Sequence, residues 1–345
     1  MKAYEKQLNI IKQFIHISMK KRALITGIAG QDGSYLAELL LEKDYEIIGI
    51  IPRRSTPETQ TLRIDHISRY LNLEYGDVLD LASIYRIMHI VKPDEIYHLA
   101  AQSHVQVSFT EPINTTSIIA LGTLNMLEAT SQFVPQAKFY HAASSEIFGN
   151  TPDFPINENS KMIPVSPYAN AKLYAYHLTR IYRVSKKLFA VNGILFNHES
   201  PRRGLNFVTA KVIKGALDIK YNKINQLKLG NLDSTRDWGH AADYVKAMWM
   251  MLQHSDPDDY VIATGKEYSV RTLCEYVFNK LGLGDYQKYV AIDQKYVRPY
   301  ELNHLQGDAS KARKILGWEP KYTFETLIDE MIDELETKFY NHTIE

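Results

Sequence analysis

The sequence lacks several features that define whole classes of protein. It has one cysteine, Cys274, so no disulfide can form within the chain, and we expect a reducing, cytoplasmic setting. Forty basic residues balance forty acidic ones without long runs of one sign, which argues against nucleic acid or an anionic membrane as a general partner. No apolar run approaches the roughly 18 residues that cross a bilayer. Without paired histidines or a cysteine cluster, we expect no metal site.

A glycine-rich turn follows the first expected strand. Arg22 to Thr26 reads as a buried strand, and Gly27, Gly30 and Gly33 then lead into a helix expected from Ser34 to Glu42. Glycines at this spacing permit a tight turn, close approach of the backbone to a pyrophosphate, and close helix packing. The free amides at the helix start favour an anion. The stretch therefore predicts a dinucleotide site, the alternative being a purely structural turn.

The second expected strand, Glu46 to Ile51, ends in a basic turn that contains Arg53, Arg54 and Ser55. A site for NAD usually has an acidic residue here to hold the ribose hydroxyls, whereas arginines suit a 2′-phosphate. The sequence therefore favours NADP over NAD. The alternative is a solvated basic loop.

Strands and helices continue to alternate, which predicts an α/β fold with a doubly wound, Rossmann-type parallel sheet and a smaller C-terminal lobe. We expect residues 1–18 to be a peripheral extension, residues 19–196 to form mainly the cofactor domain, and residues 197–345 to form mainly an interdigitating substrate lobe. Asp77 and Val78 end the third strand, where the acid suits an adenine amine. The segment from Ala100 to His104, with small residues after a strand, suits a cofactor that crosses the sheet edge.

A tyrosine and a lysine lie four residues apart on a helix that Ser166 and Pro167 are expected to open. This spacing places Tyr168 and Lys172 on one face, where an ammonium beside a phenol favours the phenolate. The bland alternative is an aromatic residue and a solvated lysine on an amphipathic helix. The strand Lys138 to Ala142 delivers Ser144 and Glu146 to the same sheet edge, where they are candidates for substrate binding and for a base. The alternative is that Ser145 and Glu146 merely cap a following turn.

Beyond the strand that ends at Phe196 the chain becomes polar and rich in turns. Basic residues separated in sequence but located in loops suggest a shared diphosphate site, with Glu301 for a ribose diol. The candidate residues in these loops are Asn197, His198, Arg203, Asn206, Val208, Lys211, Arg236, Arg298 and Glu301. Each one alone is more often a surface group. Two amphipathic helices, Asp308 to Leu316 and Phe324 to Phe339, are expected to close the substrate lobe.

From Arg22 to Leu335 the chain resembles the GDP-mannose 4,6-dehydratases, a subgroup of the extended short-chain dehydrogenases/reductases. The resemblance is carried by Ala23–Glu38, Arg53–Ser55, Leu99–Val105, Asn192–Gly204 and Arg236–His240. The segment Asn192–Gly204 is specific to the subgroup. Family members form dimers or tetramers, which implies a homo-oligomer with the Arg53–Arg54 loop at an interface.

The resemblance also implies residue roles. Tyr168 is the base at sugar O4 with Lys172 as its partner, Ser144 takes the place of a threonine near O4, and Glu146 removes the C5 proton. Positions that contact the cofactor, NADP, are Gly27, Gly30, Gln31, Asp32, Gly33, Arg53, Arg54, Ser55, Asp77, Val78, Leu99, Ala101, Ser103, Tyr168, Lys172, His198 and Arg203. Positions near the GDP-sugar are Ser103, Ser144, Glu146, Asn197, Asn206, Val208, Lys211, Arg236, Arg298 and Glu301.

Several positions depart from the family pattern: Ser144 replaces threonine, Asn114 a tyrosine, Leu205 and Ala210 charged residues, and Tyr300 a threonine. These changes keep the seven-carbon GDP-D-glycero-α-D-manno-heptose open as the substrate beside GDP-mannose. A 4-epimerase or C4 oxidoreductase would need Tyr168 and Lys172 but not Glu146. A non-catalytic NADP-sensing protein would typically have lost the tyrosine or the lysine.

Overall fold

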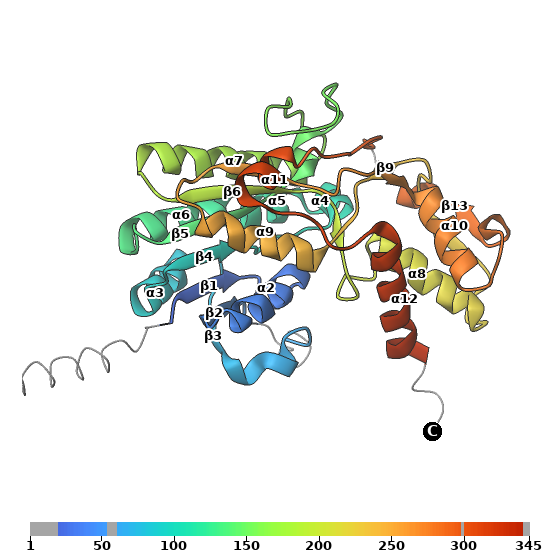
Figure 1. Cartoon of the computed structure of the whole chain (residues 1–345), viewed down its shortest axis with the longest axis horizontal. Helices are drawn as coiled ribbons and strands as arrows, with labels where there is room; N and C mark the ends of the chain where they lie inside the picture. Colours follow the sequence, from blue (N-terminus) through green and yellow to red (C-terminus); the bar gives the residue numbers. More distant parts are fainter. Residues whose placement is uncertain (1–19, 54–60, 298–299, 341–345) are drawn as a thin grey trace, which may run out of the picture.

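A seven-stranded parallel sheet forms the centre of the molecule (Figure 1). The computed structural model describes residues 20–53, 61–297 and 300–340. The strand order is β11-β6-β5-β4-β1-β2-β3, which confirms the predicted doubly wound α/β fold. The strands are β1 (Arg22–Thr26), β2 (Glu46–Ile51), β3 (Leu71–Tyr75), β4 (Glu95–His98), β5 (Lys138–Ser144), β6 (Ala190–Leu195) and β11 (Asp259–Ile262).

Helices cover both faces of this sheet, so its inner strands are continuous buried runs. In β1, Ala23 and Ile25 face the core beneath α2 (Gln31–Glu42) and α9 (Ala241–Gln253), whereas Leu24 faces the opposite core. The helices on that opposite face are α3 (Leu81–Val91), α6 (Gly122–Phe133) and α7 (Pro167–Ser185). Between β4 and α6 lie α4 (Val105–Thr110), α5 (Pro112–Thr116) and a π-helical turn (Ser117–Leu121).

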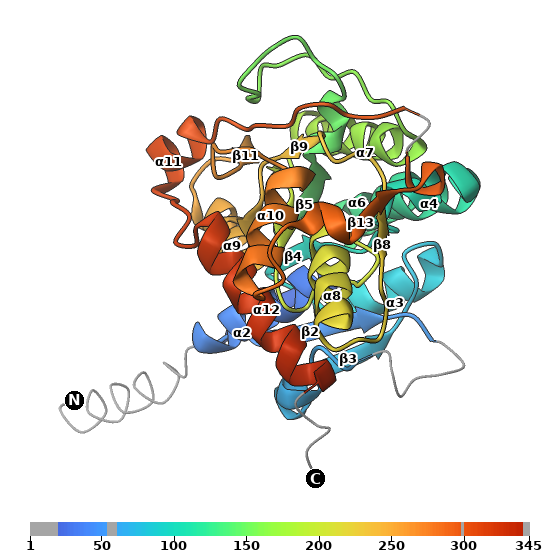
Figure 2. The same cartoon turned by 90° about the vertical axis from the view of Figure 1, so that its right-hand side faces the viewer.

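A second core is grouped at one end of the molecule, apart from the sheet (Figure 1). Its helices are α8 (Val208–Lys220), α10 (Val270–Lys280) and α12 (Phe324–Tyr340), and Figure 2 views the molecule from their side. Their apolar faces pack around the buried Trp238 and Phe324. The short strands are β7 (His198–Glu199), β8 (Leu227–Leu229), β9 (Thr235–Arg236), β10 (Gly239–His240), β12 (Tyr268–Ser269) and β13 (Val290–Ile292).

The C-terminal half contributes to both cores. Strand β11 and helix α9 follow residue 196 but belong to the sheet, so the proposed division at that residue stays a prediction. Helix α11 (Ser310–Leu316) packs against β11 and α9. The expectation that it closes the substrate lobe was wrong, because its buried Ala312 joins the core beneath the sheet.

The starts of α7 and α2 were both predicted from the sequence. Ser166 caps α7 as expected, with its hydroxyl accepting a hydrogen bond from the amide of Ala169 at 3.1 Å. Helix α2 begins at Gln31, earlier than expected, because Gly30 is its N-cap. The extension 1–18 and the site residues Arg54, Ser55 and Arg298 lie outside the described residues. Among the described helices, none combines the length and apolar character needed to cross a membrane.

Candidate active site

One cleft, with a volume of about 1130 Å³, opens at the carboxyl ends of the sheet strands. This is the edge at which open α/β sheets bind ligands. Every predicted site residue that the structure describes lines this cleft. They are Gly27, Gly30, Gln31, Asp32, Gly33, Arg53, Asp77, Val78, Leu99, Ala101, Ser103, Ser144, Glu146, Tyr168, Lys172, Asn197, His198, Arg203, Asn206, Val208, Lys211, Arg236 and Glu301.

The glycine turn forms the floor at one side of the cleft. Gly27 has a φ of +73°, which favours glycine, and a Cβ on Gly33 would lie 2.3 Å from the carbonyl oxygen of Gly27. Only glycine at 33 therefore lets the first turn of α2 pack this tightly against the turn. The start of α2 carries amides without helical partners, which suit a pyrophosphate. This geometry fits a dinucleotide cofactor.

A charged pair joins this turn to the segment after β6. The Nε2 atom of His198 lies 2.7 Å from Oδ2 of Asp32, and its Nδ1 lies 2.8 Å from the carbonyl oxygen of Phe196. Burial alone would lower the pKa of His198, but the charge of Asp32 and the hydrogen bond to it outweigh burial and raise the pKa. Burial likewise opposes the shift at Asp32, whose pKa His198 nevertheless lowers. Gln31 donates to Asp32 and to the His198 carbonyl, at 3.0 and 3.1 Å.

The segment after β4 is held by hydrogen bonds to Thr26, whose hydroxyl is in turn bonded to the buried His98. Thr26 Oγ1 accepts hydrogen bonds from the amides of Leu99 and Ala100, both at 3.1 Å, and lies 2.9 Å from Nδ1 of His98. Burial lowers the pKa of His98 to about 3, so this imidazole is neutral. Because the Thr123 hydroxyl donates to the carbonyl of Ile119, the Nε2 of neutral His98 donates to Thr123 at 3.1 Å, and its Nδ1 accepts a hydrogen bond from the Thr26 hydroxyl. The backbone that begins at Leu99 is therefore held in place along the cleft.

Tyr168 and Lys172 share a face of α7, but burial dominates their chemistry. Burial raises the pKa of Tyr168 to about 12, although a hydrogen bond with Ser144 opposes the rise. Burial also lowers the pKa of Lys172 to about 8. The Lys172 ammonium donates to the carbonyl of Ala142 at 2.6 Å and lies 6.0 Å from the Tyr168 ring centroid. The expected lowering of the phenol pKa is thus not achieved by the protein groups alone.

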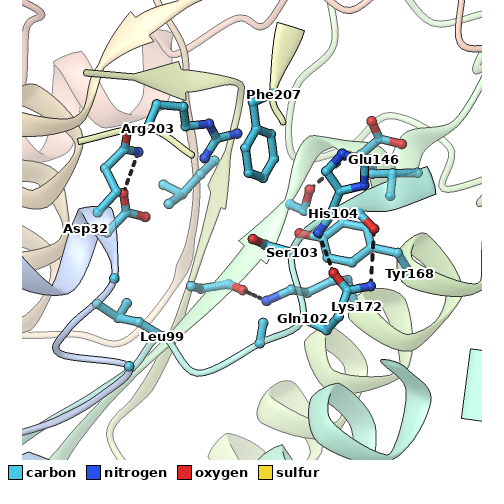
Figure 3. Close-up of a pocket in the computed structure, with 18 of the residues that line it drawn as sticks. Asp32, Leu99, Gln102, Ser103, His104, Glu146, Tyr168, Lys172, Arg203 and Phe207 are labelled. Atoms are coloured by element: carbon cyan, nitrogen blue, oxygen red, sulfur yellow. Dashed lines mark hydrogen bonds between the residues drawn. The ribbon is translucent and has the colours of Figure 1, made fainter. Parts of the chain in front are cut away.

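Ser144 and Glu146 extend from the end of β5 toward Tyr168. The Ser144 hydroxyl accepts from the amide of Glu146 at 3.3 Å and caps the 3₁₀ turn Ser145–Phe148. The turn is therefore capped by Ser144 and not by Ser145 or Glu146 as the alternative had it, and the functional interpretation stays a prediction. Glu146 is 6% exposed and close enough to Tyr168 for its charge to raise the phenol pKa. Figure 3 shows Glu146, Tyr168 and Lys172 around the same pocket.

Long cationic side chains form the opposite wall. The Arg236 guanidinium donates to the carbonyls of Thr235 and Leu302, at 2.7 and 3.0 Å, and lies 3.6 Å from the Glu301 carboxylate. The Lys211 ammonium lies 3.2 Å from the ring centroid of Tyr296. Burial lowers the pKa of Lys211, and Asp293 opposes this. Two cations beside a carboxylate can bind a diphosphate and a ribose diol.

Two lining residues, Phe207 and Tyr296, were missed from the sequence. Gln102 and His104, which belong to the predicted cofactor segment but were not singled out, line the cleft as well. Phe207 lies between the predicted Asn206 and Val208, so adjacency was the available signal. No group of three or more His, Cys, Asp or Glu residues within the described ranges is arranged to hold a metal ion.

Comparison with known proteins decides the family. The family model described as GDP-mannose 4,6 dehydratase matches residues 24–331. The chain belongs to this family. It is 49% identical over 330 residues to GDP-mannose 4,6 dehydratase 2 of Arabidopsis thaliana, covering 92% of this chain and 87% of that one. It is 46% identical over 351 residues to GDP-mannose 4,6-dehydratase of Vibrio cholerae, covering 92% of this chain and 94% of that one.

A solved structure supports the fold of this dehydratase family member. The dTDP-glucose 4,6-dehydratase DesIV from Streptomyces venezuelae, solved with NAD bound, aligns with a TM-score of 0.81 at 23% identity. The alignment covers 93% of this chain and 98% of DesIV. At this identity the likeness shows a shared fold alone.

Proposed function

We propose that this protein is an NADP-dependent GDP-sugar 4,6-dehydratase that converts GDP-α-D-mannose to the 4-keto-6-deoxy sugar. Membership of the family supports the reaction class. The observation that carries the proposal is the position of Glu146, a buried carboxylate in the same cleft as Tyr168 and Lys172. A simple C4 oxidoreductase or 4-epimerase needs the tyrosine and lysine but no second acid.

The cofactor would be held by the glycine turn, the start of α2, and the segment after β4. When bound, a nicotinamide cofactor would accept a hydride from sugar C4 and later return it to C6. The preference for NADP rests on Arg53, which is exposed at the end of β2 and lines the cleft. A guanidinium there can bind a 2′-phosphate.

In the first step Tyr168 takes the proton from the sugar O4. The neutral phenol is favoured by burial, so the step depends on positive charge near the phenol oxygen. In this proposal Lys172, 6.0 Å from the Tyr168 ring centroid, supplies part of that charge, and the Ser144 hydroxyl, which hydrogen-bonds Tyr168, binds the sugar near O4. The product of this step is a ketone at C4.

In the second step Glu146 removes the proton from C5. The C4 ketone makes this proton acidic, because the carbanion is stabilised as an enolate, so oxidation has to precede elimination. Water then leaves from C6, with Glu146 delivering the proton that the departing hydroxyl requires. Hydride return to C6 and protonation at C5 complete a reaction with no net redox change.

The seven-carbon homologue, GDP-D-glycero-α-D-manno-heptose, is a second candidate substrate. It carries an additional hydroxymethyl group at C6. Serine at 144 is smaller than the threonine expected from the family, and Asn114, which replaces a tyrosine, lines the cleft. Smaller side chains at these two positions would leave more room in the cleft, which supports keeping the larger sugar as a candidate.

The test is mass spectrometry of the nucleotide-sugar products after incubation with each GDP-sugar in parallel. Loss of one water without net reduction of the cofactor, abolished in Glu146→Gln, is the expected result. The ratio of rates then identifies the preferred sugar. Oxidation or epimerisation with no loss of water would overturn the dehydratase proposal and leave Glu146 with a structural role.

Assembly into a homodimer or homotetramer through the Arg53–Arg54 loop is part of the same proposal. Arg53 is exposed and Arg54 lies outside the described residues. Light scattering on the purified protein tests it, since a fully active monomer would contradict a shared cofactor site.

A further inference from the structure

The proposed reaction requires that the reduced cofactor stay bound between two hydride transfers. The aromatic ring of Phe207, which lines the cleft, is placed to do this. We propose that Phe207, held between Arg203 and His104, retains the cofactor during this interval. The inference rests on the proposed function but can be tested separately from it.

The first anchor of the ring is Arg203. The guanidinium carbon of Arg203 lies 3.6 Å from the ring centroid of Phe207. Its Nε lies 3.0 Å from the carboxylate of Glu199, which is 2% exposed and also accepts a hydrogen bond from Thr209 Oγ1 at 2.6 Å. A buried carboxylate strongly favours a fixed position for its cation. Arg203 therefore presents a flat guanidinium, paired with a buried carboxylate, on which Phe207 stacks.

The second anchor is His104, on the other wall. The rings of His104 and Phe207 meet edge to face, with centroids 5.3 Å apart and an interplanar angle of 62°. Nδ1 of His104 accepts from the amide of Val107 at 3.4 Å, which leaves the proton on Nε2, 3.3 Å from the carbonyl oxygen of Asn206. Gln102 fixes the His104 backbone by accepting from its amide at 2.6 Å and donating to its carbonyl at 3.1 Å.

These contacts define a bridge, Arg203–Phe207–His104, between segments that are far apart in the sequence. Figure 3 shows Phe207 between Arg203 and His104, on the side of the pocket opposite Leu99 and Lys172. The proposed cofactor residues Leu99 and Lys172 thus lie across the pocket from the ring, and a bound cofactor would be enclosed between the two sides. Because Phe207 is also the N-cap residue of α8, the bridge is continuous with the wall that carries Lys211.

The chemistry gives this bridge a measurable consequence. After a hydride has left C4 and Tyr168 has taken the O4 proton, the sugar is a 4-ketone and the cofactor is NADPH. If NADPH dissociates then, one NADPH appears in solution for each 4-keto sugar, and NADP⁺ must bind before another turnover. In the complete cycle the hydride returns to C6 and no NADPH accumulates. Dissociation of NADPH before the hydride returns is therefore detected as an increase in the absorbance of the reduced nicotinamide.

Phe207→Ala removes the ring and is expected to increase the dissociation rate of preloaded NADPH by roughly ten-fold, through loss of the cation–ring contact and of water exclusion. This rate is measured by fluorescence displacement without any GDP-sugar. In the presence of GDP-sugar and excess NADP⁺, the same variant should accumulate NADPH in proportion to a 4-keto product. Phe207→Tyr keeps the ring and should restore retention.

Tyr296→Ala is the matched control, because Tyr296 is an aromatic residue of the same cleft that stacks on Lys211 instead. It should leave the NADPH dissociation rate unchanged. If Phe207→Ala is poorly folded by thermal melting, Phe207→Leu keeps apolar volume without the flat ring and should also release NADPH faster. An unchanged dissociation rate in folded alanine or leucine variants would overturn the inference. A wild-type enzyme that dehydrates no GDP-sugar would instead overturn the proposed function.

Discussion

The two walls of the cleft present different kinds of atoms to a ligand. On the α2 side the ligand-facing groups are mainly backbone amides, held by Gly27, Gly33 and the Asp32–His198 pair. On the α8 side they are the ends of long side chains, Lys211, Arg236 and Glu301. The first wall is built on the sheet core, and the second on loops around a separate helical core.

This difference suggests a division of labour. Backbone groups at a tight turn recognise a pyrophosphate that is common to many cofactors, and they tolerate little change in shape. Long side chains can be exchanged one at a time, so under the proposed function we expect the wall that carries them to distinguish one sugar nucleotide from another. Substitutions on the first wall should therefore mainly weaken folding and cofactor binding, whereas those on the second should mainly weaken binding of the sugar nucleotide.

The largest effect is expected on the backbone wall, from Gly33→Ala. A Cβ at this position would lie 2.3 Å from the Gly27 carbonyl oxygen and 2.6 Å from Ile28 backbone atoms, so the turn must shift. We expect a loss of about 3 kcal/mol in the free energy of unfolding and loss of detectable NADP binding. Urea denaturation and calorimetric titration measure these two quantities.

Gly30→Ala is the control on the same turn. Its Cβ would meet only the Gly27 carbonyl oxygen at 3.1 Å, so the turn has to give by only a few tenths of an ångström. The variant should bind NADP measurably more weakly than wild type but far better than Gly33→Ala. Equal losses of NADP affinity in both variants would mean that the glycines act through the flexibility of the chain and not through the lack of room for a Cβ.

The same contrast explains which parts of the molecule were predictable from sequence. The glycine turn and the Ser166 cap are local, because a few adjacent residues determine the backbone there. Helix α11 was assigned to the wrong core, since its amphipathic pattern shows that one face is buried but not against what. The bridge at Phe207 was missed for a similar reason. Its partners Arg203 and His104 lie about a hundred residues apart, and only the fold brings them together.

An intermediate effect is expected from Asp237→Asn, a buried position directly behind the side-chain wall. This fully buried carboxylate accepts hydrogen bonds from four donors: the Thr264 amide at 2.9 Å, the Thr264 hydroxyl at 2.6 Å, and the amides of Gly265 and Gly307 at 2.8 and 3.3 Å. Each carboxylate oxygen accepts from two donors. In the asparagine variant one of these oxygens becomes an NH₂ group, which cannot accept, so two buried donors lose their acceptor. We expect a loss of about 2 kcal/mol in the free energy of unfolding.

Because Asp237 adjoins Arg236, this substitution should raise the KM for the GDP-sugar several-fold while the Kd for NADP stays unchanged. Steady-state kinetics and cofactor titration on one preparation separate the two effects. An increase in the Kd for NADP as large as that in KM would show that the two walls are not independent.

The smallest effect is expected where the backbone wall meets the chain after β6, at Asp32→Asn. In the wild type the pKa of His198 is raised above 6.5 and that of Asp32 is lowered below 3.8. The raised pKa of His198 stabilises the fold fully below pH 6.5, and this contribution is lost as pH rises through the folded-state value. The lowered pKa of Asp32 stabilises the fold above pH 3.8, and this contribution is lost as pH falls through its folded-state value. The pair is therefore strongest between these limits.

Without the Asp32 charge, burial is the dominant influence on His198, and its pKa should move from above 6.5 to below it. Histidine NMR titration measures this directly, with His98 as an internal reference because burial already holds its pKa at about 3. The variant should be about 1 kcal/mol less stable than wild type at pH 5, with a smaller difference at pH 9. A difference in stability that does not change with pH would mean that Asp32 acts through its hydrogen bonds to Gln31 and not through its charge. The glycine turn and the chain after β6 would then be connected by the geometry of these hydrogen bonds and not by the charge of Asp32.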